Sequence, residues 1–290
     1  MSWEPYWSDG VRDVPGHLRV WRGFPSPELG NHRDILAWLP EEEPREPLPV
    51  LYFQDGQNVF DEHTAFAGTW GAAAALGQLA SEGMPVIAVA VAHAGHDRIA
   101  EYSPFVDPKH GGGRGDAYVE FLSSSVKPAV DARFATHPDP ARTGLVGSSL
   151  GGLIATYGVF KRPDVFGLAA ALSPSFWFAE HGFVQWLGGR QYVPAQLYLD
   201  TGRFERGKVE RWWPPSESVG TALGSRRYVR SVRGVHRRLR KMGYVDGVDL
   251  RFTVDPEGFH SESCWRRRLP QALTFLLRES TATGAWAALD

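Results

Sequence analysis

A Gly-x-Ser-x-Gly motif near the middle of the chain constrains the fold more than any other feature. The short apolar run at residues 143–146 leads into Gly147, Ser149 and Gly151, and small apolar residues follow at 153–155. A strand, a sharp turn that holds a serine, and the start of a helix form a nucleophile elbow. The glycines are needed because this turn strains the serine backbone and brings its neighbours too close for side chains. A glycine-rich surface turn would show the same letters, so the rest of the chain must decide between them.

Further apolar runs predict a mostly parallel sheet. Residues 48–53 and 85–93 are continuous apolar runs, which are typical of strands buried on both faces. Strands alternate with helical segments from residue 48 to residue 254, as in an α/β chain with helices on both faces of its sheet. Two earlier segments, at 17–24 and 33–39, predict an antiparallel edge at the N-terminal end.

Composition excludes several classes of protein. The chain has 290 residues, 43% hydrophobic and 22% charged, as in an ordinary globular protein with a substantial core, and we expect one domain over residues 1–290. The net charge of −2 gives no general attraction to nucleic acid or to an anionic membrane. No apolar run reaches the roughly 20 residues that span a bilayer, and no signal peptide is predicted, so we expect a cytoplasmic protein. Nothing in the sequence indicates the oligomeric state.

A candidate acid and a candidate base follow the motif. Asp200 and Glu205 come just after one predicted strand, and His260 comes just after another. A serine, a carboxylate and a histidine in this order, each on a loop after a strand, are typical of the α/β-hydrolase fold. Ser149 would attack a carbonyl while His260 takes its proton and later returns it to the leaving alcohol. Either carboxylate could orient the imidazole and stabilise its charged form.

Two backbone amides are candidates for the oxyanion hole. Leu150 directly follows the nucleophile, and Gln57 lies in the turn that ends the buried run at 48–53. Donors at these two places hold the developing negative charge in α/β-hydrolases. No His or Cys pair has the spacing of a zinc site, and the glycine-rich loop at 111–115 fits no nucleotide-binding motif, so neither a metal nor a cofactor is predicted.

Aromatic residues are candidates for the pocket walls. Trp177 lies in an aromatic loop after a predicted strand, whereas Trp212 and Trp213 lie in the segment 203–224, a candidate lid or insertion. Each of these tryptophans could equally belong to the core. The basic segment 226–241 predicts a helix with one apolar face and a solvated basic face, rather than a surface for nucleic acid.

Several segments together resemble the esterase D / enterochelin-esterase-like family of α/β-hydrolases. The matching segments are residues 51–61, Arg98 with 101–105, 147–152, 172–178, and 258–262 with Trp265. The resemblance implies an α/β-hydrolase fold and a serine esterase, with Arg98, Glu101 and Glu262 in a supporting ion-pair network. In such relatives the acid tends to lie in a Gly-x-x-Asp/Glu arrangement, which here ends at Glu205. The resemblance therefore favours Glu205 over Asp200.

We therefore expect a serine hydrolase that cleaves small-molecule carboxylic esters through an acyl-enzyme. An acyltransferase with the same three residues is an alternative if a lid excludes water, and a non-catalytic protein that retains the fold is another. Siderophore, feruloyl, acetyl-sugar, thioester and peptide derivatives fit the sequence equally, because selectivity depends on the shape of loops.

Overall fold

A mixed sheet forms the centre of the molecule. The computed structural model describes residues 2–11, 14–208 and 215–278, and in this part of the chain nine strands pair in the order β1-β2-β3-β5-β4-β6-β7-β8-β9. The strands are β1 (Glu4–Pro5), β2 (His17–Ser26), β3 (Asn31–Leu39), β4 (Val50–Gln54), β5 (Ile87–Val91), β6 (Thr143–Ser148), β7 (Leu168–Leu172), β8 (Gln196–Phe204) and β9 (Leu250–Phe259). The pairs from β1 to β5 are antiparallel and all the pairs from β5 to β9 are parallel. The predicted parallel sheet with an antiparallel N-terminal edge is confirmed.

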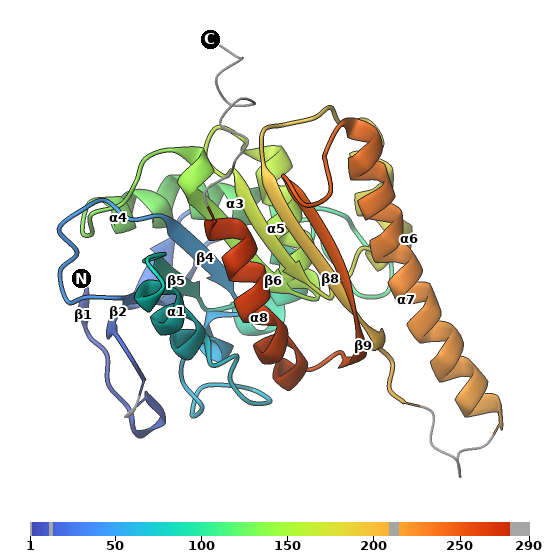
Figure 1. Cartoon of the computed structure of the whole chain (residues 1–290), viewed down its shortest axis with the longest axis horizontal. Helices are drawn as coiled ribbons and strands as arrows, with labels where there is room; N and C mark the ends of the chain where they lie inside the picture. The colour runs from blue at the N-terminus through green and yellow to red at the C-terminus, as the bar shows by residue number, and fades with distance from the viewer. Residues whose placement is uncertain (1, 12–13, 209–214, 279–290) are drawn as a thin grey trace.

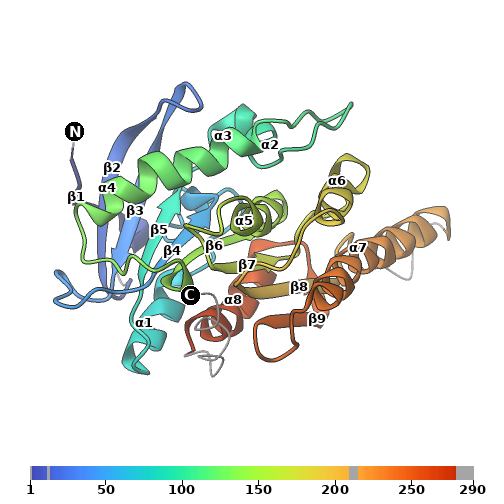
Figure 2. The ribbon, with the colours of Figure 1, turned by 90° about the horizontal axis from the view of Figure 1, so that it is seen from above.

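Helices cover both faces of this sheet (Figures 1 and 2). The α-helices are α1 (Ala72–Ser81), α2 (Arg98–Glu101), α3 (Gly115–Glu120), α4 (Lys127–Asp131), α5 (Leu150–Lys161), α6 (Phe178–Leu187), α7 (Pro215–Met242) and α8 (Glu262–Leu277). Figure 2 shows α1 and α8 on one face, α3, α4 and α5 on the other, and the long α7 beside β8 and β9. A π-helical segment, Phe121–Val126, joins α3 to α4.

The alternation of side chains along each central strand divides the core into two layers. Tyr52 of β4 packs with the cluster that includes α3, α5 and α7. Its neighbours Leu51 and Phe53 pack in the second cluster, with α1 and α8. Successive side chains of a strand point to opposite faces, so a strand covered on both sides must be apolar throughout. This requirement explains why the continuous apolar runs in the sequence are the central strands.

The loops that carry the candidate site residues meet at one edge of the sheet. Strands β4, β6, β8 and β9 run parallel, so their carboxyl ends lie on the same side. The turn with Gln57 follows β4, Ser149 follows β6, Glu205 follows β8 and His260 follows β9. Ligands of open α/β sheets bind at this edge.

Three elements differ from the sequence-based expectation. Strand β8 runs to Phe204, so Asp200 lies within this strand and only Glu205 follows it. Strand β9 continues to Phe259, where it pairs with Phe204 after a register shift. Helix α7 begins at Pro215, so the second half of the candidate lid at 203–224 is helical; proline is well tolerated in the first turn of a helix because its missing N–H has no partner there. Trp212 and Trp213 lie outside the described residues. Of the described helices, none has the length and apolar character needed to cross a membrane.

Candidate active site

Ser149 occupies a strained turn between β6 and α5. Its φ and ψ are 56° and −123°, a conformation that residues with a side chain rarely adopt. A Cβ atom on Gly147 would lie 2.3 Å from the carbonyl oxygen of Gly151, and one on Gly151 would lie 3.1 Å from Cβ of Gln54. The turn therefore excludes side chains at Gly147, and it projects the Ser149 hydroxyl at the carboxyl edge of the sheet.

Glu205 and His260 form a direct pair beside this turn. His260 Nδ1 lies 2.6 Å from Glu205 Oε2, and the side chain of Glu205 is fully buried whereas that of His260 is 28% exposed. A carboxylate can only accept a hydrogen bond, so Nδ1 carries the proton and Nε2 of a neutral ring is left as an acceptor. The ring packs edge-on between Tyr228 and Trp265, with centroids 5.5 and 5.0 Å away. These contacts fix both the tautomer and the orientation of the imidazole.

The second oxygen of Glu205 is held by the loops around it. Oε1 accepts hydrogen bonds from Ser173 Oγ at 2.6 Å, from Thr201 Oγ1 at 3.0 Å and from the amide of Gly202. Burial alone would raise the pKa of Glu205, but the hydrogen bond and charge of His260, together with Ser173 and Gly202, outweigh burial and lower this pKa below its usual value. Glu205 therefore carries its negative charge at neutral pH.

Asp200 makes different contacts from Glu205. Its Oδ1 accepts from the amide of Ser173 at 3.0 Å, and its Oδ2 lies 3.1 Å from Nε of the buried Arg268. Burial raises the pKa of Asp200 to about 6, although Arg268 opposes this shift. In the described part of the chain, no hydrogen bond or ion pair joins Asp200 to His260. Asp200 therefore anchors Arg268 and the Ser173 loop beneath the site.

The Ser149 hydroxyl belongs to a chain of hydroxyl groups. Its Oγ lies 3.1 Å from Ser175 Oγ, which lies 3.2 Å from the hydroxyl of Tyr228. Tyr228 donates its proton to the carbonyl of Ser173 at 2.6 Å, so Ser175 must donate to Tyr228 and accept from Ser149. Among the described residues, no hydrogen bond joins Ser149 to His260, and catalytic hydrogen bonds often tighten only when substrate binds.

Sequence reasoning assigned no role to Ser175 or Tyr228. Ser175 lies in the segment 172–178 that carries the family resemblance, but the resemblance implies no role for it. Tyr228 lies on the buried face of α7, and helical periodicity predicts only burial for such a residue.

The two backbone amides that the sequence offers for an oxyanion hole each lie in the first turn of a helical segment. Leu150 is the first residue of α5, and Gln57 lies in the short 3₁₀ turn after β4. In the described chain, neither amide donates a hydrogen bond to a protein acceptor. Free N–H groups at the start of a helix attract negative charge.

The turn that presents Gln57 is held by an ion pair. Asp55 has a left-handed backbone, with φ 55° and ψ 48°, and its carboxylate accepts from Nε and Nη2 of Arg98 at 2.6 and 2.7 Å. The amide of Asp55 donates to the hydroxyl of Tyr102 at 2.9 Å. A Cβ atom on Gly56 would lie 2.6 Å from the backbone of Ala90, which explains the glycine here. Arg98 thus positions a turn that lies against the elbow.

The supporting charges pair differently from the predicted network. Arg98 binds Asp55, whereas the buried Glu101 pairs with Arg33 at 2.8 Å. Among the described residues, Glu262 forms no ion pair. Arg98 and Glu101 therefore take part in two separate ion pairs.

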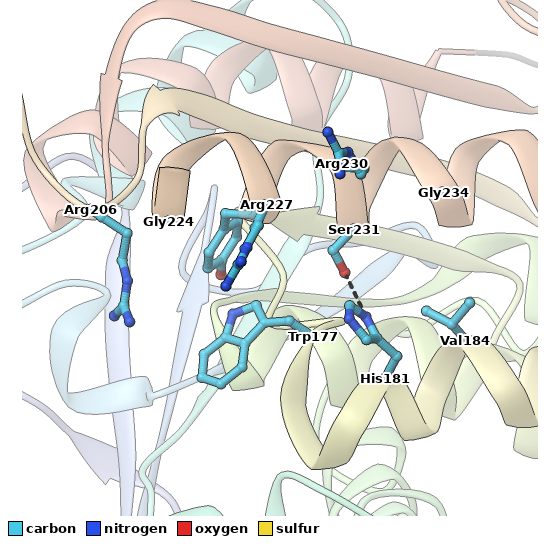
Figure 3. Close-up of a pocket in the computed structure, with 10 residues that line it drawn as sticks. Trp177, His181, Val184, Arg206, Gly224, Arg227, Arg230, Ser231 and Gly234 are labelled. Atoms are coloured by element: carbon cyan, nitrogen blue, oxygen red, sulfur yellow. Dashed lines mark hydrogen bonds between the residues drawn. The ribbon is translucent and has the colours of Figure 1, made fainter. Parts of the chain in front are cut away.

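Trp177 lies on the wall of a cavity of about 680 Å³ between α6 and α7 (Figure 3). Its side chain is partly exposed, and its ring centroid lies 6.3 Å from that of Tyr228. The cavity therefore adjoins the hydroxyl chain of Ser149.

Within the described residues, no cluster of three or more His, Cys, Asp or Glu side chains is arranged to hold a metal ion.

The chain is similar to known esterases in sequence. Residues 26–206, more than half of the chain, match the family model described as "Putative esterase". The chain is 35% identical over 149 residues to the siderophore triacetylfusarinine C esterase of Aspergillus fumigatus, a match that covers 49% of each protein. It is 29% identical over 254 residues to the iron(III) salmochelin esterase of Escherichia coli O6:H1, which covers 85% of this chain and 55% of that protein. The chain thus spans about half the length of these relatives.

The fold is also shared with solved structures. The siderophore hydrolase EstA from Aspergillus nidulans superposes with a TM-score of 0.74 at 17% sequence identity, over 95% of this chain and 98% of that chain. At this identity the likeness concerns the fold, which is that of the α/β-hydrolases. Since the family model covers most of the chain and the fold agrees with it, the chain belongs to the enterochelin-esterase-like family of esterases.

Proposed function

We propose that this chain hydrolyses carboxylic esters of small molecules through an acyl-enzyme, with Ser149 as nucleophile, His260 as base and Glu205 as the acid behind it. The observation that carries the proposal is the 2.6 Å hydrogen bond from His260 to the buried Glu205, next to a serine in a strained elbow. Structural ion pairs do not require a strained serine beside them. The combination of both features supports catalysis.

In the proposed mechanism, substrate binding turns the Ser149 hydroxyl from Ser175 to Nε2 of His260. As Oγ attacks the ester carbonyl, His260 takes its proton, and the Glu205 carboxylate stabilises the resulting imidazolium. The amides of Leu150 and Gln57 hold the oxyanion. His260 then protonates the leaving alcohol, and a water molecule activated by the same imidazole releases the acid from Ser149.

The names of the relatives suggest a substrate class. Both curated relatives above are named as esterases of siderophores. We propose an ester-containing siderophore, or a fragment of one, as a candidate substrate of this chain. Trp177 is a candidate wall for its aromatic or bulky part.

The proposal is tested by the hydrolysis of 4-nitrophenyl acetate. We expect Ser149→Ala and His260→Ala each to lower kcat/KM by about 10³-fold or more, and a fluorophosphonate to label the wild type but not Ser149→Ala. Ser148→Ala is the matched control, since Ser148 is the preceding, buried residue of β6; it should retain activity. Wild-type rates in Ser149→Ala would contradict the proposal. An acyltransferase would instead convert an added alcohol into a new ester.

A further inference from the structure

The cavity beside the hydroxyl chain has a cationic lining. It is about 680 Å³ in volume and is formed by α6 and the loop before it, by α7 and by the turn after β8. Arg206, Arg227 and Arg230 contribute to its wall, together with Trp177 and Tyr228. None of the described residues that line it is an aspartate or a glutamate. In Figure 3, Trp177 and Arg227 are drawn on facing elements, Arg206 lies apart from them on the turn after β8, and the Arg230 side chain points away from Trp177.

These arginines have no acidic partner in the described part of the chain. Further along the same helix, Arg240 is paired with Asp246 at 3.2 Å. The whole chain carries a net charge of −2, so carboxylates are abundant elsewhere. Arg206 and Arg227 therefore place uncompensated positive charge at one concave site. A cleft lined by charge of one sign concentrates ligands of the opposite sign.

The cavity lies next to the proposed catalytic centre, with Tyr228 between them. Tyr228 lines the cavity, and its hydroxyl lies 3.2 Å from Ser175 Oγ, which is itself 3.1 Å from Ser149 Oγ. Arg206 directly follows Glu205 in sequence. The cavity and the hydroxyl chain of Ser149 thus share Tyr228 as a common wall.

We propose that this cavity binds an anionic group of the ester substrate, a carboxylate or a similar oxyanion carried on a planar apolar body. The guanidinium groups of Arg227 and Arg206 hold the negative charge, because their N–H groups match the geometry of a carboxylate. The indole of Trp177 packs against the planar body. This inference rests on the proposed function and adds a charge preference to it.

The test uses two esters that differ only in the para substituent of the benzoyl ring, and comparing variants cancels their intrinsic difference in reactivity. Mono-4-nitrophenyl terephthalate carries a carboxylate where 4-nitrophenyl 4-methylbenzoate carries a methyl group. We expect the wild type to prefer the charged ester, and Arg227→Gln to lower the ratio of the two kcat/KM values by about fivefold, mainly through KM for the charged ester. The double variant Arg206→Gln with Arg227→Gln should lower it further, and Arg227→Lys should restore part of it.

Arg237→Gln is the matched control, since Arg237 is an exposed arginine on the same helix that does not line this cavity. Its ratio should equal that of the wild type. An unchanged ratio in Arg227→Gln would overturn the inference, while dependence of both reactions on Ser149 would leave the proposed function standing.

A binding measurement keeps the inference testable if neither ester is cleaved. Isothermal titration of terephthalate into Ser149→Ala should show binding that weakens about fivefold in the Arg227→Gln background and weakens with added salt. Absence of binding, or equal affinity in both backgrounds, would contradict it.

Discussion

At the scale of single residues, the carboxylates of Asp200 in β8 and Glu205 after it differ in the groups that they contact. Glu205 shares its oxygens between His260 on one side and Ser173, Thr201 and Gly202 on the other. Asp200 accepts from the amide of Ser173 and pairs with Arg268. Although only five positions apart in sequence, Glu205 contacts the imidazole of His260, whereas Asp200 supports the loop at Ser173.

Replacing the carboxylate that touches the imidazole should reduce the rate strongly. Glu205→Gln keeps the size of the side chain but removes the charge that stabilises the imidazolium, so we expect kcat for a nitrophenyl ester to fall about 10²- to 10⁴-fold. Glu257→Gln is the control, because Glu257 is exposed near the end of the neighbouring β9. A loss below threefold in Glu205→Gln would argue against its role.

The raised pKa of Asp200 predicts a pH dependence of stability. Asp200 titrates near pH 6 in the folded chain, whereas an unfolded chain releases this proton near pH 4. Its stabilising contribution is therefore complete below about pH 4 and is lost as the pH rises to about 6. The side chain of Asp200→Asn does not titrate. We therefore compare the free energies of unfolding of the two proteins: the value for the wild type minus the value for the variant should fall by about 3 kcal/mol between pH 4 and pH 7.

Urea denaturation of both proteins at several pH values measures this difference. All other groups titrate in both proteins, so they largely cancel in the subtraction. A difference that stays constant or grows with pH would contradict the assignment.

At the scale of elements, the β6–α5 turn depends on the absence of a side chain at one position. Gly147→Ala would put a Cβ atom 2.3 Å from the backbone oxygen of Gly151. We expect it to lower the free energy of unfolding by about 3 kcal/mol and to abolish esterase activity, because the strained turn must move.

A second glycine gives the opposite expectation. A Cβ atom on Gly220, in α7, would meet nothing within 4 Å, so Gly220→Ala should raise the free energy of unfolding by about 0.5–1 kcal/mol through helix propensity. Thermal and urea unfolding of both variants would check the pair. Equal effects of the two substitutions would contradict the steric argument.

At the scale of the whole molecule, α8 is tied to the sheet through Arg268. Its guanidinium reaches Asp200 within β8, Ser173 just after β7 and Asp255 in β9. Removing it would leave Asp200 buried without a counter-charge. We expect Arg268→Ala to lower the free energy of unfolding by about 3–5 kcal/mol.

The neighbouring Arg266 provides the comparison. It is exposed and lies 3.7 Å from the equally exposed Glu62, so Arg266→Ala should cost no more than about 1 kcal/mol. Urea unfolding of both variants measures the contrast. Similar losses in the two variants would show that Arg268 does not hold the helix in place.

Much of the architecture could be predicted from the sequence, because burial on both faces of a parallel sheet requires continuous apolar strands. The runs at 48–53 and 85–93 predicted strands that β4 and β5 occupy. The extension of β9 to Phe259 could not be predicted, since it depends on a register shift against β8. The helical start of α7 at Pro215 was also missed, because the Pro-rich segment before it has no helical periodicity.

The sequence by itself determined the order of the elements and the place of the elbow, because local periodicity and glycine spacing are properties of the chain. The sequence could only suggest which carboxylate contacts His260, since both Asp200 and Glu205 follow the same predicted strand. Tertiary structure decided their contacts through the packing of β8 against β9 and of Arg268 against Asp200. It also brought Ser175 and Tyr228 to Ser149 and gathered Arg206 and Arg227 at one cavity. These groups come from segments far apart in sequence: the pairing of β6 with β7 brings Ser175 to Ser149, and the packing of α7 against the sheet brings Tyr228 and Arg227 beside them.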